Sequence, residues 1–364
     1  MSGTATETIK FTNSQNRDFT SQLNKRVNEY LKTKKYGRYA NEYMVLKTVF
    51  MLSLYFVPYA IYMSGAVTQL WVFLLLALVQ GLGMAGIGLS IMHDANHGAY
   101  SRKKWVNKVM GYTLNLVGGN ATNWKIQHNV MHHTFTNIAG HDEDISPRPI
   151  LRFSPHSKKL KLHKYQFIYA WLLYGLMTIT WISFKDFKQL QGYTSTGILA
   201  KQENEKKAWA WLIFTKVVYF GYALVLPILF TPFAWYQVLL AFFITHYIAG
   251  FLLGIIFQPA HVMEENEFPL PSEEGKIDDN WSVHQLKTTI NFANNNRILS
   301  WYVGGLNYQV EHHLFPNICH VHYRKISKIV KQTAEEFGLP YKSIPTFRGA
   351  LLSHGRMLYK LGRI

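Results

Sequence analysis

Long apolar runs separated by polar connectors dominate the pattern of this chain. Five runs stand out: Met44–Met63, Leu70–Met92, Tyr165–Phe184, Ala208–Phe230 and Trp235–Phe257. Each is close to the ~20 residues that a helix needs to cross the hydrocarbon core of a bilayer. Short links join the first run to the second and the fourth to the fifth. Each of these pairs therefore predicts a helical hairpin that crosses a membrane and returns.

The third run, Tyr165–Phe184, is predicted to lie in the membrane interface. It is rich in Trp and Tyr, which favour that depth. Histidine clusters occur before this run, after the fifth run and near the C-terminus. If they form one site they share one side of the membrane, so an even number of crossings separates them. The fourth and fifth runs supply two crossings, and a third would place the clusters on opposite faces.

The pattern thus predicts an all-α integral membrane protein with four transmembrane helices in two hairpins and a cytosolic helical cap. The expected organisation begins with a cytoplasmic segment (1–43), a hairpin (44–92) and the first part of the cap (93–207), which contains the interfacial helix near 165–184. A second hairpin (208–257) and the second part of the cap (258–364) follow.

The charge of the chain agrees with this picture. Its 364 residues carry a formal net charge of +17, and Lys and Arg flank the apolar runs. A basic surface also suits nucleic acid, but no nucleic-acid motif accompanies the charge. Cytoplasmic connectors near anionic lipid explain it better, so no nucleic-acid partner is expected. The first forty residues lack an apolar signal-peptide core, and we expect a cytoplasmic N-terminus.

Histidine is the residue type that carries candidate chemistry. The chain has 16 His and a single Cys, Cys319, which excludes intramolecular disulfides and Cys-based metal clusters. His93 and His97 follow the second run directly, and a spacing of four places both on one helix face. His128 and His132 repeat that spacing, while an α-helix would rotate His133 by about 100° from His132.

A third cluster, His312 and His313, follows Gln309, and a single histidine, His261, follows the fifth run. One HxxxH pair alone is more often a surface or core feature. Three clusters abutting predicted membrane boundaries are hard to explain by packing. Neutral imidazole binds Fe, Zn, Cu and Ni, and eight imidazoles are too many for one ion. The pattern therefore predicts two metal ions.

The motifs HDANH, HNVMHH and QVEHH resemble the three histidine boxes of the membrane fatty acid desaturase family. The segment from His132 to Ile145 is similar to the one that follows the second box. The stretch GGLNYQVEHHLFP resembles the third-box signature of the front-end branch, which inserts a double bond between an existing one and the carboxyl end. The resemblance covers roughly residues 45–345.

The resemblance implies an O2-dependent acyl desaturase with a di-iron centre on the cytosolic side. It implies ligation by the box histidines and by the extra histidine after the last span, here His93, His97, His128, His132, His133, His261, His312 and His313. Gln309 stands where many desaturases have His, as is typical of the front-end branch. Weak ligation, action through water and a hydrogen bond to a ligand all stay open for it.

Supporting roles are assigned around these ligands. Asp142 and Asp144 could orient ligand imidazoles, although a solvated acidic turn is equally plausible. Asn307 is a further candidate for such support, and Trp124 with Lys125 for the substrate entrance. Histidines outside the spans that have no HxxxH or HH partner are interpreted as surface or supporting groups: His141, His156, His163, His284, His320, His322 and His354.

Partners follow from the same resemblance. Many eukaryotic front-end desaturases carry a fused cytochrome b5 domain with a His-Pro-Gly-Gly motif, and no His-Pro dipeptide occurs here. We therefore expect a separate cytochrome b5 or ferredoxin with its reductase. The substrate is expected to be a fatty acyl-CoA or a membrane lipid, for example a linoleoyl chain desaturated at the delta-6 position. A bacterial inner membrane is favoured over the endoplasmic reticulum.

Two rival functions remain. A membrane hydroxylase would use the same metal centre and add oxygen instead of removing two hydrogens. A metal transporter would need ionisable ligands at mid-membrane depth, where only His246 lies. The clusters lie at the ends of the runs, which argues against transport.

Overall fold

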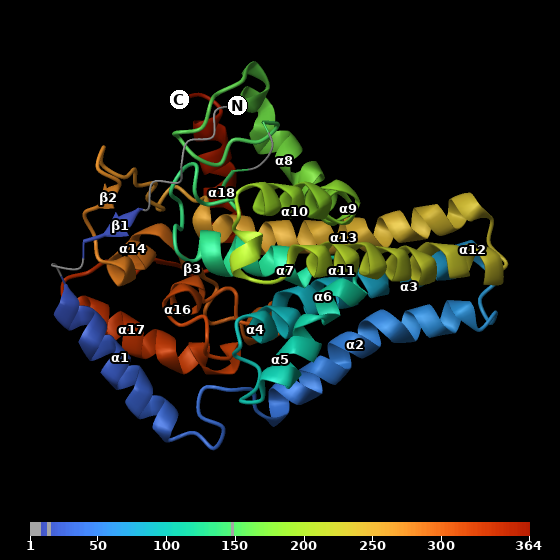
Figure 1. Ribbon diagram of the computed structural model, residues 1–364, viewed down its shortest axis with the longest axis horizontal. Helices are drawn as coiled ribbons and strands as arrows, with labels where there is room; N and C mark the ends of the chain where they lie inside the picture. Colours follow the sequence, from blue (N-terminus) through green and yellow to red (C-terminus); the bar gives the residue numbers. More distant parts are fainter. Residues whose placement is uncertain (1–8, 13–15, 147–148) are drawn as a thin grey trace.

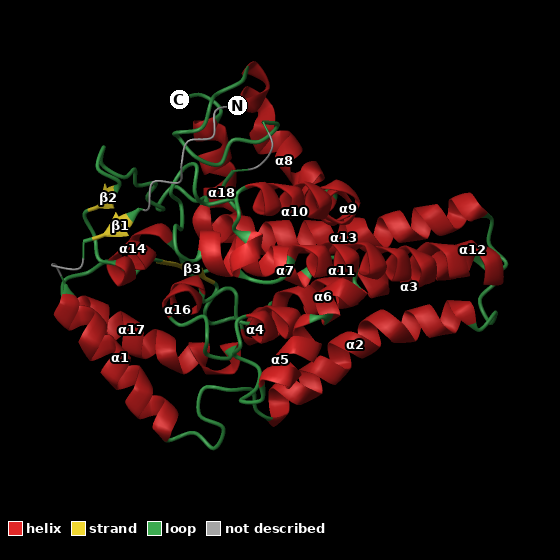
Figure 2. Ribbon diagram, in the orientation of Figure 1, coloured by secondary structure: helices red, strands yellow, loops and turns green. Residues whose placement is uncertain are grey.

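The computed structural model describes residues 9–12, 16–146 and 149–364, and the first eight residues of the predicted segment 1–43 lie outside this range. The described chain is mostly helical, with long loops in the part that carries both termini (Figures 1 and 2). Its helices in the first half are α1 (Arg17–Lys32), α2 (Glu42–Met63), α3 (Leu70–Gly86), η1 (Ile87–Ile91), α4 (Met92–Asn96), α5 (Lys104–Gly111), α6 (Thr113–Leu116), α7 (Ala121–Trp124), η2 (Lys125–His132), η3 (Lys161–Tyr165), α8 (Gln166–Gly175) and α9 (Met177–Thr180).

The second half continues with helices and a few short strands. The helices are η4 (Trp181–Lys185), α10 (Asp186–Ser195), η5 (Leu199–Lys201), α11 (Glu205–Phe220), η6 (Gly221–Val225), α12 (Leu226–Phe230), α13 (Trp235–His261), α14 (Trp281–Thr288), α15 (Arg297–Tyr302), α16 (Gln309–Leu314), η7 (His320–His322), α17 (Tyr323–Glu336) and α18 (Phe347–Leu361). Two parallel two-residue pairs join β1 (Lys10–Phe11) to β2 (Lys276–Ile277) and β3 (Asn291–Phe292) to β4 (Ser343–Ile344).

Four helical stretches are long and apolar enough to cross a membrane, as predicted. They are Glu42–Met63, Leu70–Asn96, Glu205–Phe230 and Trp235–His261. In Figure 1 they form the elongated right-hand part of the molecule. The second and fourth continue one turn beyond the predicted apolar ends, Met92 and Phe257. Hydropathy marks where the apolar depth ends, whereas the backbone hydrogen bonds continue through the histidines that follow.

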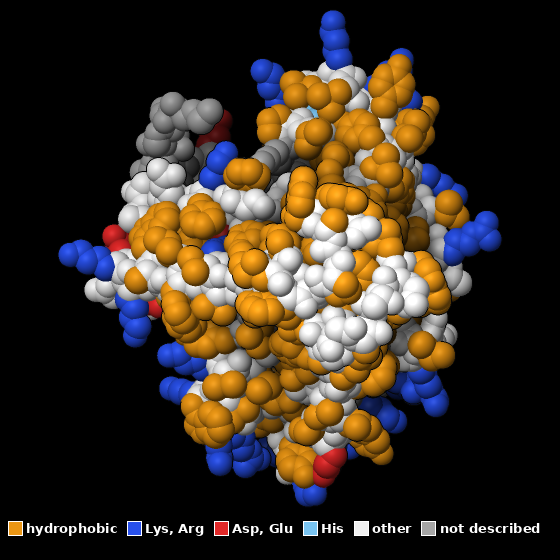
Figure 3. Space-filling view, turned by 90° about the vertical axis from the view of Figure 1, so that its right-hand side faces the viewer, with side chains coloured by type: hydrophobic (Ala, Val, Ile, Leu, Met, Phe, Trp, Pro, Cys, Tyr) orange, Lys and Arg blue, Asp and Glu red, His pale blue; other side chains and the backbone are white. Residues whose placement is uncertain are grey.

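The outer faces of these helices carry large apolar side chains. Leu46 and Val217 are 66% and 67% exposed, as lipid-facing residues would be. Figure 3, which looks onto the end of the bundle, shows a largely hydrophobic face with Lys and Arg gathered around its outline. The protein is therefore a multi-pass membrane protein with basic connectors.

The third apolar run forms a bent pair of helical segments. Lys161–Gly175 and Met177–Ser195 meet at an angle of 65°. A Cβ on Gly250 of α13 would lie 2.7 Å from the carbonyl oxygen of Gly175, so glycine permits this close approach. Figure 1 shows α8 and α10 turning back beside α13. The bend suits a segment that enters the interface and returns, and its failure to cross stays a prediction.

The cap is assembled from both ends of the chain. Helix α1 buries one stripe, Phe19, Leu23, Val27 and Leu31, in a cluster with residues of α17. Arg26 donates to Thr333 and Glu336 of α17 across this contact. The N-terminal segment thus helps to cover the C-terminal part of the cap, which hydropathy alone did not indicate.

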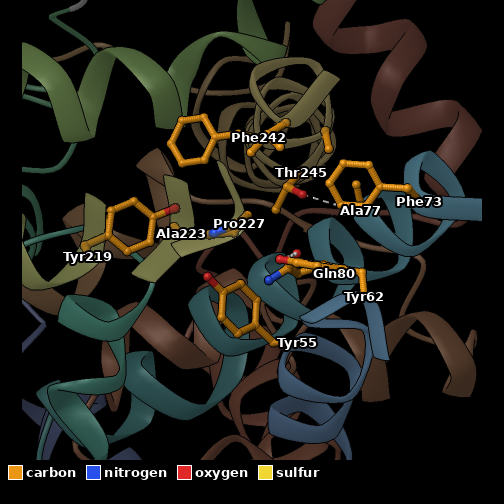
Figure 4. A pocket seen from close by; sticks show the side chains of 12 residues that line it. Tyr55, Tyr62, Phe73, Ala77, Gln80, Tyr219, Ala223, Pro227, Phe242 and Thr245 are labelled. Atoms are coloured by element: carbon orange, nitrogen blue, oxygen red, sulfur yellow. Dashed lines mark hydrogen bonds between the residues drawn. The ribbon is translucent and has the colours of Figure 1, made fainter. Parts of the chain in front are cut away.

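A small cavity lies inside the membrane bundle, among α2, α3, the α11–α12 stretch and α13 (Figure 4). Its volume is about 20 Å³, which is room for about one water molecule. Polar groups in its wall are bonded within the bundle: Tyr62 donates to Gln80 at 3.3 Å, and Thr245 donates to the Ala77 carbonyl at 3.0 Å. The bundle core is closely packed here.

Candidate metal centre

The eight predicted histidines converge where the second and fourth membrane helices end. In Figure 1 this is the region around α4, α7 and α16. One group of ring nitrogens lying within 4.8 Å of one another comes from His93, His97, His128 and His312. A second comes from His132, His261 and His313, and His133 joins His312 and His313 in a third. Segments up to 220 residues apart in sequence thus supply one continuous imidazole cluster.

The second histidine box differs locally from the α-helix assumed above. Its residues lie on the π-helix η2, and the amide of His133 donates to the carbonyl of His128 at 3.0 Å. One turn of a π-helix is wider than one of an α-helix, so His133 lies one turn after His128 and on the same side of the helix. The rotation of about 100° from His132 that an α-helix would give therefore does not carry His133 away from the other imidazoles. Its Nε2 lies 3.3 Å from that of His128. Single π-turns are frequent at functional sites because they re-aim side chains.

The third box is positioned by two glycines. Gly304 and Gly305 have φ values of 63° and 68°, which a residue with a Cβ rarely adopts. A Cβ on Gly304 would also overlap the carbonyl oxygen of Leu89. This close approach sets the start of α16 against η1 and α4, and so brings His312 to His93, with ring centroids 4.5 Å apart.

Several buried nitrogens and oxygens in this cluster have no hydrogen-bond partner among the described residues. They are His93 Nε2, His97 Nε2, His133 Nδ1, both ring nitrogens of His261, His313 Nε2 and both amide atoms of Gln309. Buried polar groups are normally bonded, so such a concentration calls for an explanation. A nitrogen-rich set of unpaired imidazoles fits transition metals well. The side-chain amide of Gln309 likewise has no hydrogen-bond partner among the described residues, as a metal ligand or a water-binding group would.

In several of these imidazole rings, the Nδ1 atom is hydrogen-bonded to a neighbouring side chain. His132 Nδ1 lies 3.0 Å from both carboxylate oxygens of Asp142, and His128 Nδ1 lies 3.4 Å from Asp144. Asp142 in turn accepts from the backbone N–H of Asn137 at 2.9 Å. Such contacts fix the tautomer and leave Nε2 free for a metal. The geometry suits the orienting role predicted for both carboxylates.

Two more partners of this kind were missed by sequence reasoning. His313 Nδ1 lies 2.9 Å from Gln285 Oε1, and His312 Nδ1 lies 3.2 Å from the Tyr323 hydroxyl. Neither residue belongs to a spacing motif. Gln285 lies on α14, and only the packing of α14 against α16 reveals its role.

Electrostatics keep most of the cluster neutral. Burial lowers the pKa of His128 to about 3, and burial followed by neighbouring imidazoles holds the pKa values of His133, His312 and His313 well below the usual range. His132 is different: burial lowers its pKa, but the charges of Asp142 and Asp144 outweigh this and raise it to about 9. Neutral imidazole is the form that binds metal.

The other predicted residues lie as follows. The Trp124 ring is 4.5 Å from that of His128, so it forms part of the cluster wall. Lys125 is half-buried beside it, and burial lowers its pKa. Asn307 donates to the Phe292 carbonyl at 3.1 Å and to Ser300 at 2.9 Å, which fastens the turn before α16. Its described side-chain hydrogen bonds go to β3, the residue after it and α15, and not to an imidazole.

Several of the histidines predicted to be surface or supporting groups are buried and so belong to the supporting kind. They are His163, His284, His320, His322 and His354. His284 Nε2 bonds the Thr136 carbonyl at 2.8 Å, and His354 Nδ1 bonds that of Val262 at 2.7 Å. These rings fasten loops of the cap from inside, a role for which a lone histidine gives no sequence signal.

One further group, Asp94, Cys319 and His320, has metal-like spacing. His320 Nδ1 lies 2.7 Å from Asp94, and Cys319 donates to the same carboxylate oxygen at 3.0 Å. Lys47 Nζ already lies 2.7 Å from His320 Nε2. A buried ammonium thus supplies the positive charge here, and the group works as an internal anchor between α2, α4 and η7.

Comparison with known proteins gives a consistent result over nearly the whole chain. The sequence model of the fatty acid desaturase family matches residues 69–345. The chain is 38% identical to the sn-1 linoleoyl-lipid 6-desaturase of Synechocystis, over 98% of each chain. It is also 38% identical to the enzyme of the same name from Arthrospira platensis, over 97% of this chain and 95% of the relative. An acyl-lipid (8-3)-desaturase of Physcomitrium patens is 36% identical, over 98% of this chain and 74% of its own length.

Proposed function

The chain belongs to the fatty acid desaturase family and is an oxidoreductase of fatty acyl chains, and from this premise we propose that it is a front-end acyl-lipid 6-desaturase. Its substrate would be a linoleoyl chain esterified in a membrane glycerolipid. The observation that carries the proposal is the convergence of all three histidine boxes on one buried cluster. The 38% identity to two linoleoyl-lipid 6-desaturases supports the position and the lipid carrier.

We assign two iron ions to this cluster. His93, His97, His128 and His312 would hold one, and His132, His261 and His313 would hold the other. His133 lies between the groups, with its Nε2 3.0 Å from that of His312. Gln309, unpaired and buried, would bind directly or through water. Bound iron with O2 would supply the oxidising power that no side chain has for an unactivated methylene pair.

The residues of the chain bind, orient and exclude water. Asp142 and Asp144 hold His132 and His128 through their Nδ1 atoms, and Gln285 and Tyr323 do so for His313 and His312. Trp124 covers His128 and limits access of water. A site at the end of membrane helices suits the substrate, because an acyl tail gains ~0.8 kcal/mol for each CH2 that it buries in lipid.

We further propose that the cluster faces the cytoplasm of a bacterial inner membrane and receives electrons from a separate carrier. The net charge of +17 lies largely on connectors and on the cap. Such a surface attracts an acidic carrier, either a ferredoxin or a cytochrome b5, and speeds its encounter.

Expression in a host whose lipids contain linoleoyl chains tests the function. Mass spectrometry of derivatised fatty acids should locate a new double bond at carbon 6, with loss of two hydrogens and no gain of oxygen. A His312→Ala, His313→Ala variant, expressed at equal level, should leave the lipids unchanged. A hydroxylated product would overturn the desaturase assignment. A new double bond at another carbon would overturn only the position.

A further inference from the structure

A groove lies on the surface of the cap, between α8 and α18. It encloses about 690 Å³ and is lined by apolar residues of both helices. The two helices touch through Phe167 and Tyr359, whose ring centroids are 5.2 Å apart, and Gln166 donates to the Leu358 carbonyl at 2.9 Å. Trp171 and Leu351 complete the floor. The groove is large enough for part of a lipid, because ligand pockets of proteins have volumes of ~300–1,000 Å³.

The rim of the groove is strongly basic. Arg356, Lys360 and Arg363 lie around it, and Glu264 is the acid that lines it. Arg356 is 69% exposed and lies 3.9 Å from Glu264, a distance at which solvent competes for both charges. Lys360 is exposed and has no hydrogen bond or ion pair with a described residue. Basic side chains thus outnumber acidic ones on this rim, which favours an anion.

The surroundings place the groove at a membrane surface. Ile168 and Leu172 on α8 are 59% and 64% exposed, and Leu352 on α18 is 51% exposed. Exposed apolar side chains next to a basic rim suit the boundary between hydrocarbon and lipid head groups. A phosphate group above and a hydrocarbon chain below would match this order, whereas an acidic protein segment would leave the apolar floor uncovered.

The groove is separated from the histidine cluster by the body of α18. Gly355 faces the groove, while its neighbour His354 points inward, with Nδ1 2.7 Å from the Val262 carbonyl and Nε2 2.6 Å from the Tyr174 hydroxyl. None of the proposed ligands of iron lines the groove. A lipid held wholly within the groove would therefore not reach the histidine cluster. It would instead press α18 against the segment that follows His261.

We propose that the groove between α8 and α18 binds one anionic membrane phospholipid, with its phosphate at Arg356 and Lys360 and an acyl chain on Phe167 and Trp171. This site is additional to the proposed acyl substrate site. Its occupation stabilises the packing of α18 on the cap without entering the chemistry of the reaction.

Two variants test the proposal by different routes. Arg356→Gln, Lys360→Gln removes the exposed charges. Gly355→Leu fills the floor without changing charge, and it is tolerable because a Cβ there meets only Trp171, at 3.6 Å. Lys325→Gln, Lys328→Gln on α17 is the matched control, since it removes two exposed charges elsewhere.

The full-length protein is purified in mild detergent, and bound phosphatidylglycerol is counted by native mass spectrometry. Thermal unfolding is compared in nanodiscs of phosphatidylglycerol and phosphatidylcholine. Wild type and control should retain phosphatidylglycerol and unfold at higher temperature in it. Arg356→Gln, Lys360→Gln should bind it roughly 10-fold or more weakly, in line with the attraction of two cations near a lipid surface. Gly355→Leu should weaken binding by occupying the space of the acyl chain, and both variants should unfold like wild type in phosphatidylcholine.

Equal retention of phosphatidylglycerol by wild type and both groove variants would overturn the proposal. Equal stabilisation by inorganic phosphate would reassign the rim to a free anion. Displacement of the lipid by an acidic peptide at matched concentration would reassign the groove to a protein partner. None of these results depends on desaturase activity, so the proposed function is tested separately.

Discussion

Helix α13 contains two buried histidines whose surroundings differ completely. His246, in the middle of the membrane span, is bonded on both sides: Nε2 to the Tyr219 hydroxyl at 2.6 Å and Nδ1 to Thr178 at 3.1 Å. His261, at the end of the same helix, has no described partner for either nitrogen. Burial alone therefore does not identify a ligand. The difference lies in whether the protein itself satisfies the ring.

The same contrast separates the two regions of the molecule. Most buried polar groups within the bundle bond one another, as the hydroxyls of Tyr55 and Tyr222 do at 2.9 Å, and the indole nitrogen of Trp211 is an exception. An unsatisfied polar group there would cost several kcal/mol, because lipid offers no replacement partner. At the end of the bundle, unpaired nitrogens accumulate instead. Among the described residues, most of the buried nitrogens without a partner belong to this cluster, where bound metal would satisfy one nitrogen of each ring.

The largest effect on iron content and activity is expected from replacing each of the two histidines of α13 by alanine in separate variants. His261→Ala should lower the iron content and reduce desaturation by at least about 100-fold, since a ligand is lost. His246→Ala should keep the iron and most of the activity, but lower the unfolding temperature, because Tyr219 and Thr178 lose their partner. Iron per protein by elemental analysis and product by gas chromatography separate the two outcomes.

Comparable loss of iron from both variants would break the distinction between satisfied and unsatisfied imidazoles. Full iron content in His261→Ala would remove that residue from the ligand set. Circular dichroism on both proteins establishes that each retains its helices before the comparison is made.

A smaller effect is expected from the partners of these rings. Asp142→Asn weakens the hold on His132 Nδ1 and should reduce iron affinity about 10- to 100-fold. Thr178→Val removes a partner of His246 and should leave iron affinity unchanged. Competition with a chelator measures both affinities. Equal affinity in the Asp142→Asn variant and in wild type would mean that the carboxylate does not position the ligand.

The sequence was informative where function depends on pattern. Apolar length marked five runs, four of which are helices long enough to cross a membrane, and histidine spacing predicted which segments meet at one site. Gly304 could be recognised in the sequence as part of a motif. The reason for a glycine there, its positive φ and its close approach to the Leu89 carbonyl, is visible only in the structure. Only the folded chain shows which backbone approaches which.

Other features depend on contacts that no local pattern encodes. The π-turn that aligns His133 with His128 arises from backbone hydrogen bonding, and an α-helix was the natural assumption. Gln285 reaches His313 only because α14 packs beside α16. The packing of α1 on α17 and the groove at α18 are tertiary features of the same kind.

The smallest expected effect concerns Glu311. This residue adjoins the proposed ligands, but its side chain is hydrogen-bonded within the protein. Its carboxylate oxygens accept from Asn291 at 2.9 Å and from Tyr341 at 3.1 Å. Burial outweighs these bonds and raises its pKa from 4.5 to about 7. The carboxyl group of Glu311 thus binds its proton more tightly in the folded protein than in the unfolded chain. The associated stability is complete below about pH 4.5 and is lost as the pH rises through about 7.

Glu311→Gln fixes the neutral form and should remove this dependence. Between pH 5 and pH 8, wild type should lose up to about 3 kcal/mol more stability than the variant. Thermal unfolding at both pH values, followed by tryptophan fluorescence, measures the difference. The imidazoles titrate in both proteins, so their contribution cancels in the comparison. Parallel pH profiles would show that the pKa of Glu311 is not raised in the fold, and that the hydrogen bonds from Asn291 and Tyr341 fully offset its burial.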